Sequence, residues 1–265
     1  MPRRDLLSRR PLLLGVVHLQ PLPGSPGHKP GGRWRQRAVS DARVYGEAGF
    51  DGVVVENFGD APFFAGRVPA ETSTALAVAA RAVRDALPPT LSVGVNVLRN
   101  DGRAAVAIAA AAGLDFIRVN VLAGAVVTDQ GLVEGEAAEL LRDRARLAPA
   151  LKILADVRVK HAAPLAPRPI EEEALDLVER AGADALILTG SRTGRVVDRD
   201  ELVGLRETLP DAFLLVGSGT SRHTVRGLLA DADGAIVGTA VKRGSRTDAP
   251  VDRRRAAAFV QSARG

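Results

Sequence analysis

Polar side chains stand where six short apolar segments of the chain end. They are His18, Glu56, Asn57, Asn96, Asn120, Asp156 and Thr189. A polar group that ends an apolar segment is costly to bury without a partner, so together they predict one shared polar site. Any one of them alone would be explained equally well by a loop cap or a hydrogen bond to the backbone.

The two carboxylates in this set, Glu56 and Asp156, are the candidate catalytic bases. His18 is the candidate proton donor. If the segment around Asp156 stays extended, Lys160 lies on the same side, either as an electrophilic or Schiff-base lysine or, as we favour, in an ion pair with Asp156. The amides and the hydroxyl are expected to bind substrate: Asn57, Asn96, Asn120 and Thr189.

A divalent metal ion is the only cofactor that these residues suggest. Glu56, Asp156 and His18 offer oxygen and nitrogen ligands from separate segments. No local spacing motif supports such a site.

Two glycine-rich turns near the C-terminus predict phosphate binding. The first contains Gly217, Ser218 and Gly219, and the second contains Gly238 and Thr239. Such turns can present backbone N–H groups and a helix N-terminus to an anion. Lys242 is expected to add positive charge there. The alternative is that both turns merely close the fold.

These residues need a scaffold, and a repeat along the chain indicates which one. Helix-like stretches end in small-residue turns at Asp51, Asp115, Asp184 and Asp233, and others end at a proline; both devices stop helices. The predicted strands centre on Leu14, Val54, Gly94, Arg118, Leu154, Ile187, Leu215 and Ile236. Eight strand–helix units predict a single-domain α/β fold over residues 1–265, a closed parallel (β/α)8 TIM barrel. An open doubly wound sheet is the rival, but it would not need the eighth unit.

Three connections after strands are long, at residues 20–35, 57–71 and 121–135. The first two hold Trp34, Phe58, Phe63 and Phe64 among only nine aromatic residues. We expect either a lid or partner surface, or a loop that packs on itself.

Composition excludes other classes. The 265 residues contain no Cys, which removes disulfides and thiolate chemistry, and no apolar run is long enough to cross a membrane. We therefore expect a cytoplasmic protein. The net charge of +5 includes a basic segment at residues 1–10, but without interleaved aromatic residues it does not favour a nucleic-acid partner.

The chain also resembles the BtpA/SgcQ family over nearly its whole length. The matching segments are 15–19 (GVVHL), 21–26 (PLPGSP), 51–63 (DGVVVENFGDAPF), 94–101 (GVNVLRND), 116–120 (FIRVN), 155–157 (ADV), 160–161 (KH), 189–190 and 193–194 (TG), and 217–219 (GSG). The resemblance implies a ribulose-phosphate-binding type of barrel. Its cyanobacterial members are linked to photosystem I biogenesis at the thylakoid membrane, and others occur beside carbohydrate genes. It implies no single reaction.

Two functions from different classes follow. The first is an enzyme that isomerises, epimerises or cleaves a small phosphorylated sugar. The second is a non-catalytic assembly or stability factor for a membrane protein complex, in peripheral contact with the membrane. A hydrolase or transferase at a nucleoside or glycosidic bond is a weaker alternative. A homo-oligomer is expected in each case.

Overall fold

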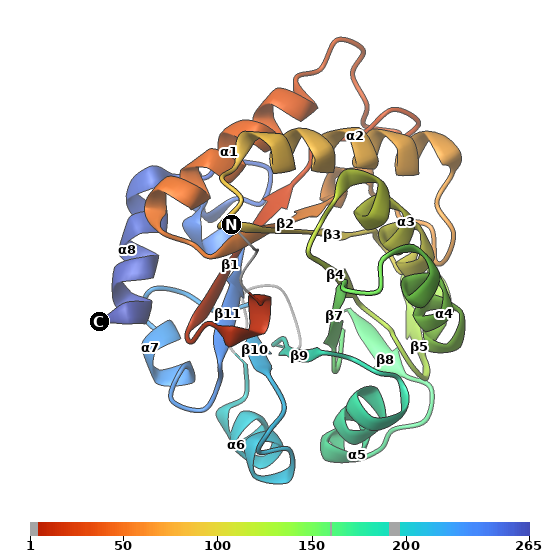
Figure 1. Ribbon diagram of the computed structural model, residues 1–265, viewed down its shortest axis with the longest axis vertical. Coiled ribbons are helices and arrows are strands. Elements are labelled where there is room, and N and C mark those ends of the chain that lie inside the picture. The colour runs from red at the N-terminus through yellow and green to blue at the C-terminus, as the bar shows by residue number, and fades with distance from the viewer. Residues whose placement is uncertain (1–4, 160, 191–196) are drawn as a thin grey trace.

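The computed structural model describes residues 5–159, 161–190 and 197–265. Eight parallel strands close into a barrel in the order β1-β11-β10-β9-β7-β4-β3-β2 (Figure 1). Their bounds are β1 Leu12–His18, β2 Gly52–Glu56, β3 Ser92–Asn96, β4 Phe116–Val119, β7 Lys152–Asp156, β9 Ala185–Leu188, β10 Leu214–Val216 and β11 Gly234–Val237. The predicted closed barrel is confirmed, and each predicted strand centre lies inside an observed strand.

Helices surround the barrel (Figure 1). They are α1 Trp34–Ala48, α2 Ala70–Ala86, α3 Gly102–Ala112, α4 Ala137–Leu147, α5 Ile170–Leu175, α6 Arg199–Thr208, α7 Val225–Leu228 and α8 Arg253–Arg264, with short turns of 3-10 or π-helix between some elements. Gly49 and Gly113 end α1 and α3 in the left-handed conformation, with φ of 93° and 67°, as the repeat predicted. Trp34 was expected in a loop but begins α1 and packs against the core.

The four aspartates of the repeat tie the strands together at the N-terminal end of the barrel. Each accepts a backbone N–H from the preceding strand along the chain, at 2.8–2.9 Å: Leu13 to Asp51, Val93 to Asp115, Ile153 to Asp184 and Leu214 to Asp233. Each also pairs with an arginine from a surrounding helix: Arg264, Arg84, Arg144 and Arg206 in the same order. The repeat therefore encodes a structural clamp as well as a helix stop.

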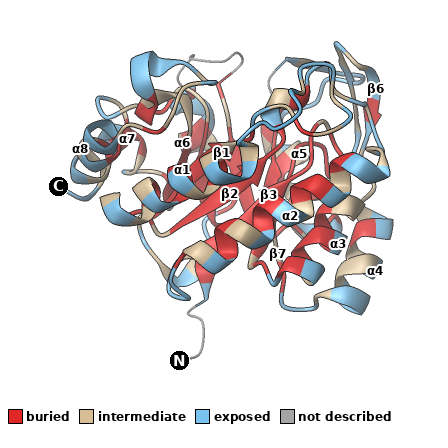
Figure 2. Ribbon diagram, turned by 90° about the horizontal axis from the view of Figure 1, so that it is seen from above, coloured by how far each residue is buried: buried red, intermediate tan, exposed pale blue. Residues whose placement is uncertain are grey.

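The barrel interior is filled by large apolar side chains. Phe116 is fully buried, and the pairing of β3 with β4 places it opposite Gly94. A Cβ on Gly94 would lie 2.3 Å from the Phe116 ring, so this glycine makes room for the ring. A larger apolar layer packs between the strands and the helices, and Figure 2 shows it as the red interior.

The connection at 121–135 is not an irregular loop. It forms a hairpin of β5 Ala125–Thr128 and β6 Gly131–Glu134, and β8 Ala162–Pro164 from the next connection pairs with β5. Val133 of β6 is buried and packs with Val121 and Val159. Among the described residues, no helix is both long and apolar enough to span a membrane.

Candidate functional site

Two of the seven polar strand-end residues line a cavity of about 420 Å³ at the C-terminal mouth of the barrel. His18 and Glu56 line it from β1 and β2, and Arg118 lines it from β4. The turns after β10 and β11 complete the wall with Ser218, Gly219, Gly238 and Thr239, and with Gly217. Strand closure thus brings residues from both ends of the sequence to one cavity.

A buried guanidinium connects the two carboxylates. Arg118 contacts Asp156 at 3.0 Å and Glu56 at 3.8 Å. Asn120 donates to Asp156 at 2.6 Å, and Asn96 donates to Glu56 at 3.1 Å. Burial opposes the charge of Arg118, but the two carboxylates outweigh it and raise the pKa of Arg118 above its ordinary value. Arg118 therefore stays a cation in the site.

Sequence reasoning used Arg118 only as a strand centre and missed this role. The signal was present: one arginine interrupts the otherwise apolar segment FIRV. A charge in a strand that is buried on both faces needs a partner, and Asp156 is that partner.

The arrangement corrects the metal hypothesis. Within the described residues, no group of three His, Cys, Asp or Glu side chains is placed to hold a metal ion. The Arg118 guanidinium lies between Glu56 and Asp156, where a cation would have to sit. Glu56, Asp156 and His18 therefore do not form a metal site in this arrangement.

Arg118 is the ion-pair partner that the described residues supply for Asp156. The side chain of Asp156 is fully buried, and its ion pair is with Arg118. Lys160 itself lies outside the described residues. Arg158, two residues after Asp156, pairs with Glu173 at 3.0 Å.

Two predicted substrate-binding residues make hydrogen bonds within the protein. Asn57 is buried, donates to Asp60 at 3.2 Å and accepts from the Leu98 N–H at 2.7 Å, so it holds the loop that follows β2. Thr189 donates to the Arg158 carbonyl at 3.0 Å. Neither lines the cavity beside Glu56.

Asn120 lies beside a further cavity of about 310 Å³, between the hairpin sheet and α5. Its Oδ1 is buried and has no hydrogen-bond partner among the described residues. Asp156 lines this cavity too, whereas Arg118 lines the larger one. The Arg118–Asp156 ion pair therefore separates the two cavities.

Both glycine turns line the cavity that holds Glu56, but not every amide is free to bind an anion. The Gly217 N–H donates to the Leu188 carbonyl at 2.7 Å. The helix expected directly after this turn is only the four residues of α7, and after Gly238 the chain enters a 3-10 turn at Thr239–Val241. Helix dipoles therefore contribute little here, and the turns offer close backbone approach and hydroxyls instead.

His18 lies between the carboxylate cluster and a buried lysine. Its Nε2 is 3.8 Å from Glu56 Oε1, and its Nδ1 is 2.7 Å from Lys242 Nζ. Its ring also packs on Phe58, with centroids 4.7 Å apart. Burial lowers the pKa of Lys242 to about 8. Lys242 was expected to serve phosphate, but it points to His18.

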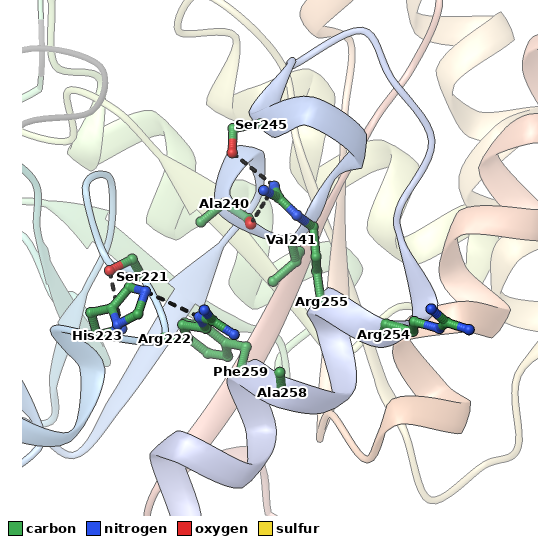
Figure 3. A pocket seen from close by; sticks show the side chains of 10 residues that line it. All are labelled: Ser221, Arg222, His223, Ala240, Val241, Ser245, Arg254, Arg255, Ala258 and Phe259. Atoms are coloured by element: carbon green, nitrogen blue, oxygen red, sulfur yellow. Dashed lines mark hydrogen bonds between the residues drawn. The ribbon is translucent and has the colours of Figure 1, made fainter.

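Another cavity, of about 490 Å³, is lined by the segment before α7, the turns after β11 and α8 (Figure 3). It shares Ser221, Ala240 and Ser245 with the cavity of the mouth and does not reach the carboxylates. Arg255 crosses it and donates to Ser245 Oγ at 2.7 Å and to the Ala240 carbonyl at 3.3 Å (Figure 3). Arg255 therefore braces the turn that carries Lys242.

Comparison with known proteins places the chain in a sequence family and a fold. The model of the BtpA family matches residues 9–265. An uncharacterized protein of Pyrococcus abyssi is 47% identical, over 98% of this chain and 99% of its own. The photosystem I biogenesis protein BtpA of Synechocystis is 41% identical, over 94% and 87%.

Solved structures share the fold at low sequence identity. A native KDPGal structure has a TM-score of 0.61 at 18% identity, covering 95% of this chain and 94% of that one. Phosphoribosyl anthranilate isomerase from Thermus thermophilus has a TM-score of 0.57 at 14% identity, covering 94% and 96%.

Proposed function

This chain belongs to the BtpA family, and on that premise we propose that it is an enzyme that moves a proton on a small phosphorylated sugar, as an isomerase, epimerase or lyase does. One observation carries the proposal: an acid–base set and two glycine turns line the same cavity. The fold shared with phosphoribosyl anthranilate isomerase is consistent with it, although fold alone does not assign a reaction.

The geometry supports distinct roles for the two carboxylates. Glu56 lines the cavity and is the proposed base, and Asn96 holds one of its oxygens. The side chain of Asp156 is fully buried, so its proposed role is to position Arg118. Arg118 would stabilise negative charge that develops on the substrate when the proton leaves.

The phosphate is assigned to the opposite wall. Ser218, Gly219, Gly238 and Thr239 line it from the turns after β10 and β11. Binding there would hold the sugar carbons toward Glu56 and His18, which replaces a bimolecular encounter by a fixed geometry. Asn120 and Thr189 stay predicted substrate-binding residues, Gly217 a predicted phosphate-binding residue and Lys160 a predicted catalytic residue.

A thermal-shift panel tests binding. Sugar phosphates, nucleotides and inorganic phosphate are compared with the matching unphosphorylated sugars, with and without divalent metal ions. We expect selective stabilisation by one class of sugar phosphate, by linkage. Ser218→Asp should abolish the shift by repelling phosphate, whereas Ser262→Asp on α8 should leave it intact.

Proton transfer is tested separately with a ligand that the panel identifies. In deuterated water the protein should exchange a carbon-bound hydrogen of that ligand, as seen by NMR. Glu56→Gln should slow the exchange by about 100-fold or more while binding persists. Binding without any exchange, or exchange that survives in Glu56→Gln, would rule out the assigned base. A cleaved glycosidic bond in the same samples would favour the hydrolase or transferase alternative.

An assembly role is the second candidate, and exposed apolar side chains favour it. Val127, Leu132 and Leu165 on the hairpin sheet and Phe64 on the loop after β2 are exposed. The Synechocystis relative bears a photosystem I biogenesis name. Co-sedimentation with membranes carrying a protein complex, lost in Val127→Ser/Leu165→Ser, together with no response to any phosphorylated compound, would favour it. Cytoplasmic location and homo-oligomerisation remain predictions.

A further inference from the structure

Lys242 is a buried lysine that the proposed proton transfer does not use. It is 1% exposed, and its Nζ lies 2.7 Å from His18 Nδ1 and 2.8 Å from the Thr247 carbonyl. The lysine comes from the segment after β11 and the histidine from the end of β1, 224 positions away in the sequence. Barrel closure between β1 and β11 creates the contact.

The hydrogen-bond chemistry of this contact fixes the imidazole. A lysine ammonium has three donors and no acceptor. His18 Nδ1 must therefore accept, and the proton of a neutral His18 must be on Nε2. A doubly protonated His18 would lose this bond and place two cations 2.7 Å apart.

The Nε2 edge of the ring faces the site. It lies toward Glu56 Oε1 at 3.8 Å, and a Cβ on Gly238 would lie 3.3 Å from Nε2. The missing side chain at Gly238 thus leaves the ring in place beside the proposed phosphate turn. His18 lines the cavity, so an Nε2–H there is within reach of a bound molecule.

We propose that Lys242 is a positioning residue that holds His18 neutral and protonated on Nε2, so that His18 donates a hydrogen bond to a carbonyl oxygen of the substrate. The tautomer follows from the contact alone. The carbonyl oxygen rests on the proposed function, and it narrows the substrate to a phosphorylated aldose or ketose whose neighbouring carbon gives its proton to Glu56. A neutral imidazole donor suits an oxygen that gains negative charge as that proton leaves.

The charges around Lys242 set the pH range in which Lys242 donates to His18 Nδ1. Burial lowers the pKa of Lys242 most; Asp41, Glu56 and Asp248 raise it and Arg37 lowers it further, and the net value is about 8. Arg255, which donates to the Lys242 carbonyl at 2.8 Å, holds the backbone in place. Below about pH 8 the ammonium donates to Nδ1; above it a neutral amine can accept, and Nδ1–H becomes allowed.

The test is NMR of protein labelled with ¹⁵N in histidine, because nitrogen chemical shifts distinguish the two tautomers and the imidazolium. The chain has only four histidines, so a His18→Gln spectrum assigns the His18 signals. At pH 7 we expect His18 with Nε2 protonated and Nδ1 bare. As the pH rises past about 8, the Nδ1–H form should begin to appear.

Lys242→Met is the decisive variant, and Lys152→Met is its matched control, since Lys152 pairs with Asp184 at the other end of the barrel. In Lys242→Met, His18 should become a tautomer mixture at pH 7, form imidazolium at a higher pH than in the parent, and lose the change near pH 8. The control should keep the parent spectrum. If Lys242→Met does not fold, Lys242→Arg, which keeps a donor, should keep the Nε2–H form.

Two outcomes overturn the proposal. One is a parent protein whose His18 is imidazolium or Nδ1-protonated at pH 7. The other is a folded Lys242→Met protein whose His18 is unchanged. Neither readout depends on substrate, so a failed tautomer prediction leaves phosphate binding and hydrogen exchange standing, and a failed exchange assay leaves the tautomer result standing.

Discussion

Both ends of the barrel carry buried or half-buried carboxylates, but their partners differ. At the N-terminal end Asp51, Asp115, Asp184 and Asp233 each accept a backbone N–H and pair with an arginine of their own. At the C-terminal end Glu56 and Asp156 share the single guanidinium of Arg118. The four aspartates have their own hydrogen-bond and ion-pair partners and therefore hold the structure together. Glu56 and Asp156 share one cation beside a cavity, so hydrogen-bonding groups there can still bind a ligand.

The pKa directions follow the same division. Burial opposes ionisation of Asp233, yet hydrogen bonds from the Leu214 N–H, Arg10 and Arg206 lower its pKa overall. For Lys242, beside the mouth, burial dominates and lowers the pKa to about 8. Asp233 at the N-terminal end thus holds its charge firmly, whereas Lys242 beside the mouth can change protonation near physiological pH.

The largest loss of stability should come from removing Arg118, the cation that Glu56 and Asp156 share. Arg118→Met leaves Asp156 buried without its ion-pair partner, and we expect the free energy of unfolding to fall by about 4 kcal/mol at neutral pH. The loss should shrink as pH falls, because a proton taken up by the folded variant would neutralise the unpaired buried charge. Urea unfolding at several pH values measures this. If Arg118→Met were as stable as the parent protein, the ion pairs of Arg118 would not contribute to stability.

Removing one aspartate clamp at the N-terminal end of the barrel should lower the unfolding free energy slightly less than Arg118→Met does. Asp115→Ala removes the acceptor of the Val93 N–H and the ion-pair partner of Arg84, for an expected loss of about 3 kcal/mol in unfolding free energy. Asp85→Ala is the control, because Asp85 forms an exposed pair with Arg81 and its removal should leave the unfolding free energy essentially unchanged. The increase in melting temperature on ligand binding should persist in both Asp115→Ala and Asp85→Ala. A clamp variant that folds well but loses binding would contradict the division between the ends.

The lowered pKa of Lys242 predicts that the unfolding free energy increases with pH above about 8. Its pKa is about 8 when folded and 10.5 ordinarily, so between these values the unfolded chain binds more protons and stability rises with pH, by up to about 3 kcal/mol. Lys242→Met should lack this rise. Measurements should stay below pH 10, because burial raises the pKa of Tyr45, and stability then falls as the unfolded tyrosine ionises. Equal slopes in parent and variant would remove Lys242 as the source.

The smallest stability effect should come from the proposed base. Glu56→Gln keeps an oxygen that can accept from Asn96, so the unfolding free energy should change by less than about 1 kcal/mol. The same variant should lose hydrogen exchange on a bound ligand. A large loss of stability in Glu56→Gln would make Glu56 a structural residue like the aspartates of the opposite end.

The sequence predicted more of the scaffold than of the site. Helix stops and apolar segments are local signals, so the eight strand centres were correct. Asn57 was expected to face a substrate, but a carboxamide after a strand can equally hold its own loop, and only the Leu98 and Asp60 contacts distinguish the two. Arg118 was overlooked because its partner, Asp156, is 38 residues away.

By itself the sequence determined the alternation of strands and helices and the polar residues that end the strands, because both depend on near neighbours in the chain. The tertiary structure decided which of these polar groups meet. Barrel closure and strand register put Arg118 between two carboxylates and placed Lys242 against His18, 224 positions away. Local sequence could not select these partners, because the contacting residues are far apart in the chain.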